Sequence, residues 1–253
     1  VAAIEALQSV TPADVQTVSE MKQWLLQSKR TQAWDTPINS VNAVYAFFGG
    51  NCESLGASKP MAVLKLNGQT LDMPKATAGL GYVKTAKTGE KMKTLSIEKQ
   101  TDGTSWGAVY AQFVQPTADV ADAAEGMSVV REVLKNGKRI ATDGETLAVG
   151  DRITVRIVIN ADRDYDFVQL ADRRAACLEP LGQLSGYRDG CYCEPKDNAT
   201  NYYFDRLSKG KHVVETEYYV DRAGTYQTGT CTVQCAYSPE FGARTKAVAL
   251  SVE

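Results

Sequence analysis

The sequence predicts a mainly β protein of the α+β class, with a short N-terminal α-helical segment followed by two antiparallel β-sandwich-type regions. Two observations lead to this prediction. Apolar residues recur every three or four positions over residues 1–48, which is the period of a helix; after Gly50 they alternate with polar residues, which is the period of a strand. The composition, 43% hydrophobic and 23% charged, is typical of a globular protein, and 253 residues fit one large domain or two ordinary ones.

The first two helices are expected at residues 1–9 and after Thr11. Thr11 suits an N-cap, Pro12 suits the first helical position, and Asp14 completes a weak capping box. An apolar stripe with helical spacing follows, consisting of Val15, Val18, Met21, Trp24, Leu25 and Leu26.

A third helix is expected from Thr36 and Pro37 to the Gly49-Gly50 pair. Its apolar residues are Val41, Val44, Tyr45 and Phe48. Three short helices cannot bury such stripes by themselves. They therefore indicate either the end of a larger helical array or a small helical cap that packs on the next domain.

The period changes to that of β-structure after Gly50. Asn67 and Gly68 are a strong hairpin signal between two strands, and a further turn is expected at residues 101–103. Strands are expected at residues 61–66, 69–73, 95–99 and 106–115. Residues 116–126 are small and acidic, which favours a linker or a surface crossing.

The clearest β-pattern begins at Met127. The strand at 152–159 has one apolar face, formed by Ile153, Val155, Ile157 and Ile159. Further strands are expected at 128–134, 168–170, 202–204, 213–220, 230–236 and 244–252. Short strands separated by turns predict an antiparallel sandwich of about 125 residues.

Charge, hydropathy and histidine content exclude several classes of protein. The net charge of −2 argues against a strongly basic nucleic-acid binder, and no apolar run is long enough to cross a membrane. The single histidine, His212, excludes multi-histidine metal sites, and its alternating surroundings indicate a strand residue. The chain opens on a helical pattern without a signal-like segment, so we expect it to be a piece of a longer protein.

Five of the six cysteines lie in the last third of the chain. These disulfide candidates are Cys177, Cys191, Cys193, Cys231 and Cys235. On a strand, sulfurs at i,i+2 or i,i+4 are roughly 7 Å or 13 Å apart and cannot bridge to each other, although each could pair with a neighbouring strand. Free buried thiols are the alternative. Zinc fits less well, because its sites prefer two residues between paired cysteines.

Charged clusters offer the remaining candidates for chemistry. Asp162, Asp164 and Asp166 alternate with other residues, but they lack the glycine and the final glutamate of a calcium loop. A solvated loop with local ion pairs is therefore favoured, and the same interpretation applies to residues 172–174 and 186–190. The sequence thus predicts no catalytic, cofactor-binding or metal-binding residue, and no cofactor.

Several C-terminal motifs, in order, resemble the C-terminal domain of bacterial α2-macroglobulin-like proteins. They include Leu184-Ser-Gly-Tyr-Arg-Asp-Gly190 and Ala236-Tyr-Ser-Pro-Glu-Phe-Gly242. The full set is residues 164–180, 184–190, 202–205, 218–226 and 236–245, with 21–34 and 43–46 resembling the last helices of the family's thioester domain.

The resemblance implies three domains. Residues 1–49 would be the helical tail of an α/α-toroid thioester domain, 50–120 a CUB-like β-region, and 121–253 a macroglobulin-type antiparallel β-sandwich. Full-length members are secreted or periplasmic protease traps that capture an attacking protease through an internal thioester. That thioester needs Cys-x-Glu-Gln, and the chain contains no Glu-Gln pair.

The resemblance therefore implies a parent-level function and only a structural role for this piece. We expect a C-terminal fragment of an exported endopeptidase inhibitor, periplasmic or at the cell surface, that is not itself an enzyme. Its partners would be target endopeptidases, through the full-length parent, and the other macroglobulin domains, but not nucleic acid. The alternative is a cell-surface interaction or adhesion module that keeps the architecture without trapping proteases. An enzyme that uses carboxylate pairs would require Asp164 or Asp189 for its activity.

Overall fold

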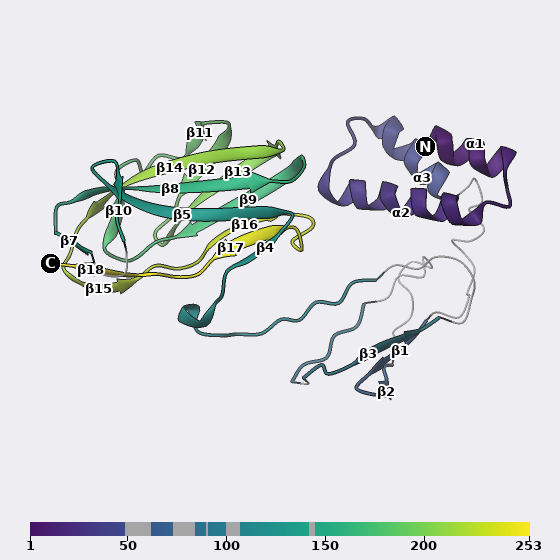
Figure 1. Ribbon diagram of the computed structural model, residues 1–253, viewed down its shortest axis with the longest axis horizontal. Helices are drawn as coiled ribbons and strands as arrows, with labels where there is room; N and C mark the ends of the chain where they lie inside the picture. The colour runs from purple at the N-terminus through teal and green to yellow at the C-terminus, as the bar shows by residue number, and fades with distance from the viewer. Residues whose placement is uncertain (49–61, 73–83, 90, 100–106, 142–144) are drawn as a thin grey trace. The chain divides into compact units, whose positions relative to one another are not determined.

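The structure is a computed structural model that describes residues 1–48, 62–72, 84–89, 91–99, 107–141 and 145–253 (Figure 1). Two compact units are present: Val1–Leu25 with Trp34–Ala111, and Leu26–Ala33 with Gln112–Glu253. Strands dominate and almost all pair antiparallel, which confirms the predicted fold class. The predicted domain boundaries, 1–49, 50–120 and 121–253, stay a prediction.

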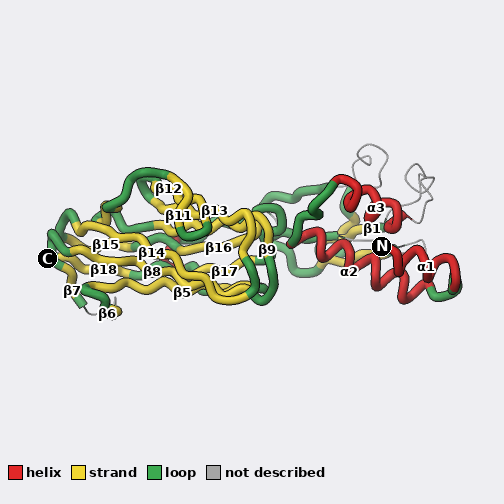
Figure 2. The backbone as a smooth tube through the Cα atoms, turned by 90° about the horizontal axis from the view of Figure 1, so that it is seen from above, coloured by secondary structure: helices red, strands yellow, loops and turns green. Residues whose placement is uncertain are grey.

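Three helices begin the chain, as the sequence predicts: α1 (Ala2–Val10), α2 (Val15–Thr31) and α3 (Pro37–Phe48) (Figure 2). The predicted start of the second helix is wrong. Thr11 instead ends α1, because both its amide and its hydroxyl donate to the carbonyl of Leu7. The N-cap of α2 is Asp14, whose Oδ1 accepts from the amide of Thr17 at 3.2 Å.

The helices bury a small apolar cluster made of Ile4, Leu25, Ala43 and Ala46. Val18 and Met21 of the predicted stripe pack against it, whereas Trp24 is 67% exposed. In α3, Val41, Val44 and Tyr45 of the apolar stripe are exposed, which agrees with the expectation that three short helices cannot bury such stripes by themselves. Alanines three residues apart present a small surface to α1, so the backbones approach closely and the larger side chains face away.

A three-stranded antiparallel sheet follows, in the order β2-β1-β3. Its strands are β1 (Val63–Leu66), β2 (Gln69–Thr70) and β3 (Leu95–Glu98). The predicted turn is confirmed: Asn67 and Gly68 both have positive φ, 50° and 83°, as a type I′ hairpin requires. The Asn67 side chain also accepts from the amide of Lys93 at 2.8 Å, which ties the hairpin to the segment before β3.

The strand predicted at 106–115 is wrong over its described part. Residues 107–116 contain no helix or strand, and Tyr110, Phe113 and Val114 are exposed. Alternation alone cannot make a strand without a neighbour to accept its hydrogen bonds. The predictions at Gly49-Gly50, 101–103 and Trp106 lie outside the described residues.

The second unit contains the predicted sandwich. One sheet has the order β10-β14-β8-β5-β6, with β5 (Met127–Lys135), β6 (Lys138–Arg139), β8 (Arg152–Ala161), β10 (Leu178–Pro180) and β14 (Gly210–Val220). The other has the order β11-β12-β13-β9-β16-β17-β4, with β4 (Ala123–Glu125), β9 (Tyr165–Arg173), β11 (Gly186–Arg188), β12 (Cys191–Pro195), β13 (Ala199–Leu207), β16 (Cys231–Cys235) and β17 (Gly242–Thr245).

Smaller elements complete this unit. A third sheet, β15-β18-β7, contains β7 (Thr146–Leu147), β15 (Gly224–Gln227) and β18 (Ala249–Val252), and its β18–β7 pair is parallel. A single 3₁₀ turn, η1 (Thr117–Asp119), precedes β4. No helix in the described part of the chain is long and apolar enough to cross a membrane.

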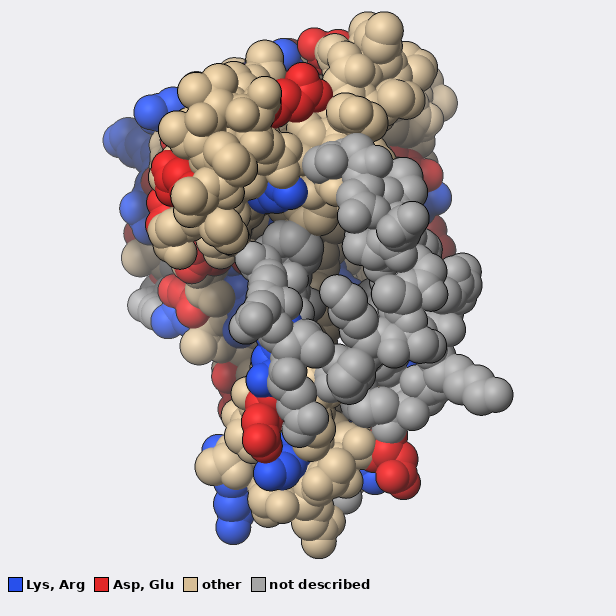
Figure 3. Space-filling model, turned by 90° about the vertical axis from the view of Figure 1, so that its right-hand side faces the viewer, with Lys and Arg blue, Asp and Glu red and all other residues tan. Residues whose placement is uncertain are grey.

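The two larger sheets bury one continuous apolar core. The predicted face of β8 forms its centre: Ile153, Val155, Ile157 and Ile159 are all at most 5% exposed. Side chains from β9, β13 and β16 meet this face from the other sheet. Outside the core, basic and acidic side chains are interspersed on the face shown in Figure 3, as the small net charge leads one to expect.

A glycine corner connects the two large sheets. The chain leaves β4 in one sheet and enters β5 in the other at Gly126, which has φ 70°. A Cβ there would collide with the Tyr165 hydroxyl, which donates to Asp162 at 2.6 Å. The linker interpretation of 116–126 is therefore wrong for Ala123–Glu125, since β4 pairs with β17.

Candidate functional site

The five candidate cysteines are buried and are free thiols in the structure. In the strand registers, no described cysteine lies opposite another on an adjacent strand. Two strands, β13 and β9, separate β12 from β16, so Cys193 and Cys231 are about 14 Å apart from strand spacing alone, beyond disulfide reach. An oxidised pair stays a prediction, and it would have to form by another route than along this sheet.

The surroundings of the buried thiols make them unreactive. Burial raises the pKa of Cys191 to about 11 and that of Cys235 to about 11, and it also raises the pKa of Cys177 and of Cys231. Such thiols stay protonated at neutral pH and are weak nucleophiles. In the described part of the chain, no cluster of His, Cys, Asp or Glu could hold a metal ion.

The aspartates after β8 make local contacts. Asp162 accepts from Arg163 and from the Tyr165 hydroxyl, and Asp164 accepts from Arg206 Nη2 at 2.7 Å and from the amide of Lys209 at 2.8 Å. These contacts lower the pKa of both carboxyl groups. Both are therefore ionised and paired at neutral pH, which confirms the predicted local ion pairs and provides no proton donor.

A buried ion pair lies in the interior, where the sequence predicted a solvated loop. Arg131 Nη1 donates to Asp172 Oδ1 at 3.0 Å, and the two side chains are only 5% and 3% exposed. Arg131 Nη2 also donates to Thr228 Oγ1 at 2.7 Å. The solvated interpretation is therefore wrong for Asp172. Burial raises the pKa of Asp172, and the guanidinium of Arg131 opposes that rise.

Position parity along the strands could have revealed this pair. Arg131 is two residues from Val129 and Val133 on β5, and Asp172 is two residues from Leu170 on β9; all three apolar residues face the core. Both charges therefore occupy inward positions of alternating strands. A charge at such a position is a signal for a buried partner.

His212 and Arg174 complete the set of candidates. His212 lies on β14, with Nε2 2.6 Å from the carbonyl oxygen of Ser208, which agrees with its interpretation as a strand residue. Arg174 donates to three backbone carbonyls, those of Leu178, Asp197 and Ala199, at 2.7 to 3.0 Å. Such contacts hold a loop in place.

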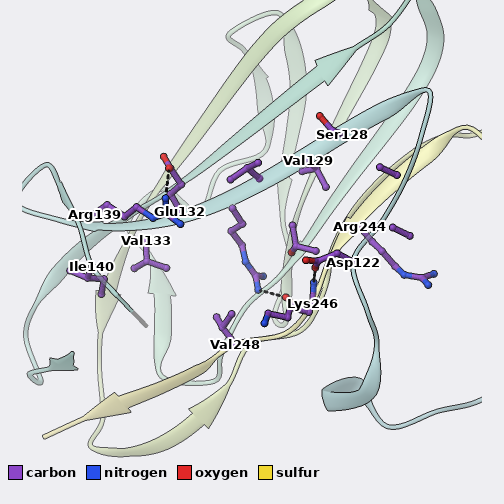
Figure 4. A pocket seen from close by; sticks show the side chains of 15 residues that line it. Asp122, Ser128, Val129, Glu132, Val133, Arg139, Ile140, Arg244, Lys246 and Val248 are labelled. Atoms are coloured by element: carbon purple, nitrogen blue, oxygen red, sulfur yellow. Dashed lines mark hydrogen bonds and ion pairs between the residues drawn. The ribbon is translucent and has the colours of Figure 1, made fainter. Parts of the chain in front are cut away.

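A cavity of about 510 Å³ lies beside the buried pair, between β5 and β6 of one sheet and β4 and β17 of the other (Figure 4). Glu132 and Arg139, 3.4 Å apart, lie at one end. Asp122 lies toward the other end, where its Oδ1 accepts from the amide of Lys246 at 2.6 Å. The lining combines apolar, basic, acidic and hydroxyl side chains and contains no histidine or cysteine. The hydroxyls of Ser128 and Thr245 therefore have no histidine in the lining to act as a general base.

Most of the sandwich matches a known protein-family model. Residues 126–240 match the family model described as the bacterial alpha-2-macroglobulin MG10 domain. The buried ion pair and the five cysteines lie within this segment, and about half of the residues that line the cavity do. A comparison with curated protein sequences gave no match.

Solved structures extend the likeness of the fold. The chain is similar to trypsin-activated alpha-2-macroglobulin from Escherichia coli, with 15% identity, 99% of this chain and 18% of that chain covered, and a TM-score of 0.54. The Escherichia coli protein activated by porcine elastase has 17% identity and a TM-score of 0.53, with 99% of this chain and 23% of that chain covered. Salmonella alpha-2-macroglobulin reacted with methylamine has 20% identity and a TM-score of 0.47, with 53% of this chain and 10% of that chain covered. The chain spans less than a quarter of the length of each of these proteins.

Proposed function

We propose that the chain is part of a bacterial macroglobulin that inhibits endopeptidases, because residues 126–240 match the family model described as the bacterial alpha-2-macroglobulin MG10 domain. The family match is the observation that carries this proposal. The fold likeness over 99% of the chain agrees with it. On this proposal, residues 1–49 end the thioester domain, 50–120 form the CUB-like region, and 121–253 form the terminal macroglobulin domain.

Within the inhibitor, this chain serves as scaffold and is not an enzyme. Its thiols are buried, its aspartates after β8 are consumed by local ion pairs, and Arg131 and Arg174 donate to internal acceptors. Each of these groups stabilises the sandwich and leaves nothing poised for covalent chemistry. Capture of a protease would therefore rest on other domains of the parent.

The partners and the compartment follow from the same proposal. The parent would act on endopeptidases outside the cytoplasm, in the periplasm or at the cell surface, and the sandwich would pack against the remaining domains of the same molecule. Nucleic acid is not expected, because the net charge of the chain is −2 and charges of both signs are interspersed.

The test uses the full-length parent with trypsin and with elastase. A trap that encloses a protease blocks digestion of a large protein substrate but spares cleavage of a small chromogenic peptide. We therefore expect the ratio of protein-digesting activity to peptide-cleaving activity to fall. Bovine serum albumin in place of the parent controls for substrate competition. An unchanged ratio and no complex on native gels would contradict the proposal and favour an interaction or adhesion module.

A second measurement separates covalent from steric trapping. The parent is treated with methylamine, and intact mass and free thiols are then measured. One methylamine adduct together with one new free thiol would mean that the parent has an intact thioester. If both the mass and the number of free thiols stay the same, any trapping is steric.

A further inference from the structure

The first half of β5 is an open strand edge. β8 pairs with the whole length of β5, but β6 pairs only with Leu134 and Lys135 on its other side. The carbonyl of Val133 points away from β8, because it accepts from the amide of Ile140 at 2.9 Å. Backbone direction alternates along a strand, so Val129 and Arg131 also direct their amide and carbonyl groups away from β8. No strand of the described residues pairs with them on that side.

This edge lies on the cavity described above. Val129, Val130 and Val133 line one wall, while Thr245 and Val248 line the opposite wall. The cavity therefore combines free main-chain groups with apolar side chains at strand spacing. These are the two features that an added β-strand uses, the first for affinity and the second for side-chain selection.

The polar groups around the cavity indicate the charge of its occupant. Four basic residues line it against two acidic ones, Asp122 and Glu132. Arg131 is neutralised by Asp172 and Arg139 pairs with Glu132, whereas Arg244 and Lys246 make no ion pair within the described part of the chain. Asp122 offsets one of these two charges, so one positive charge remains in the lining.

We propose that this cavity binds an extended acidic peptide, which adds as a strand to the open edge of β5. The peptide main chain pairs with Val129 and Arg131, its apolar side chains enter the cavity, and its carboxylates approach Arg244 and Lys246. The proposal does not depend on whether the parent inhibits proteases. It concerns a binding site on the sandwich itself.

The test measures binding of a labelled octapeptide, with valine alternating with glutamate or aspartate, to the full chain by fluorescence anisotropy. The decisive variant is Val129→Pro, which removes one outward amide and keeps the pairing with β8. Val129→Thr is the comparison variant, because it keeps the amide and the β-branched shape. We expect the proline variant to bind the peptide about fivefold or more weakly than the threonine variant does.

A charge variant tests the same site without altering the strand. Lys246→Glu should bind the acidic peptide severalfold more weakly than Lys246→Arg, which keeps the positive charge. It should also favour a peptide with lysine at the acidic positions. Hydrogen exchange should show new protection on β5 when the acidic peptide binds. Equal binding of acidic and basic peptides, equal binding by the proline and threonine variants, or no saturable binding up to about 1 mM would overturn the proposal.

Discussion

Replacing Arg131 with methionine tests the buried ion pair of the sandwich. The guanidinium donates to Asp172, to Thr228 and to the carbonyls of Arg173 and Lys246. Methionine fills much of the same volume but leaves the carboxylate of Asp172, which is 2% exposed, without a cation. Breaking a buried pair from one side costs about 3–5 kcal/mol, so the free energy of unfolding should fall by that amount at pH 8.

The loss should depend on pH in a definite direction. Burial already raises the pKa of Asp172 above its usual range, and removal of Arg131 raises it further. A carboxyl group with a raised pKa in the folded state binds its proton more tightly there than when unfolded. Stability therefore falls as pH rises from the unfolded pKa to the folded one, by about 1.4 kcal/mol per unit. The deficit of Arg131→Met should accordingly be smaller at pH 5 than at pH 8.

Urea unfolding of the wild type and the variant at both pH values measures these differences. The double variant Arg131→Met with Asp172→Asn is the control, because an amide has no proton to lose and the extra pH dependence should vanish. A deficit below about 1 kcal/mol at pH 8 would show that the pair is not buried as described. A deficit that is the same at both pH values would show that the carboxyl group of Asp172 does not titrate as argued.

Three further predictions concern the core, the corner and the thiols. Ile157→Ala should destabilise by about 2–5 kcal/mol because it empties a buried site, while Val213→Ala, at a 43% exposed position, should change stability by less than about 1 kcal/mol; thermal unfolding compares the two. Gly126→Ala should lower the free energy of unfolding, because the alanine would have a positive φ and its Cβ would collide with the Tyr165 hydroxyl. If the double variant Gly126→Ala with Tyr165→Phe regains stability, the collision causes the larger share of the loss. Burial raises the pKa of Cys191 to about 11, so a reduced Cys191 should resist iodoacetamide at pH 8 until urea is added. Rapid modification in the native state would refute its burial. Non-reducing peptide mapping shows whether any pair of cysteines is oxidised.

The strands that sequence alone located best are those with one clean apolar face. Alternation over 152–159 identified β8 and its buried side, because a central strand with a core on one side must alternate. The same rule failed over 107–115, where alternating residues form no strand. Alternation reports that side chains could share a face, but strand formation also needs a partner, and local sequence does not encode the partner.

The buried charge pair shows the corresponding limit for the site. Arg131 and Asp172 are 41 residues apart and belong to opposite sheets, so no local motif joins them. The charged side chains of Arg131 and Asp172 suggested exposed positions, whereas the alternation of side chains along their strands directs both toward the core. When the two signals conflict, parity has the stronger physical basis, because it is fixed by the backbone, while a long charged side chain can be buried once it has a partner. The open edge of β5 needed the structure, since only the pairing shows which side of a strand is free.

The sandwich and the three helices differ in how completely they bury their apolar residues. The sandwich core is closed by its own strands, from Met127 to Val252. The helices bury only a small apolar cluster, whose members include Ile4 and Ala46, and they leave Trp24, Val41 and Tyr45 exposed. Clustered exposed apolar side chains mark surfaces that other structure covers. The exposed residues of the helices therefore agree with the expectation that three short helices cannot bury their apolar stripes by themselves.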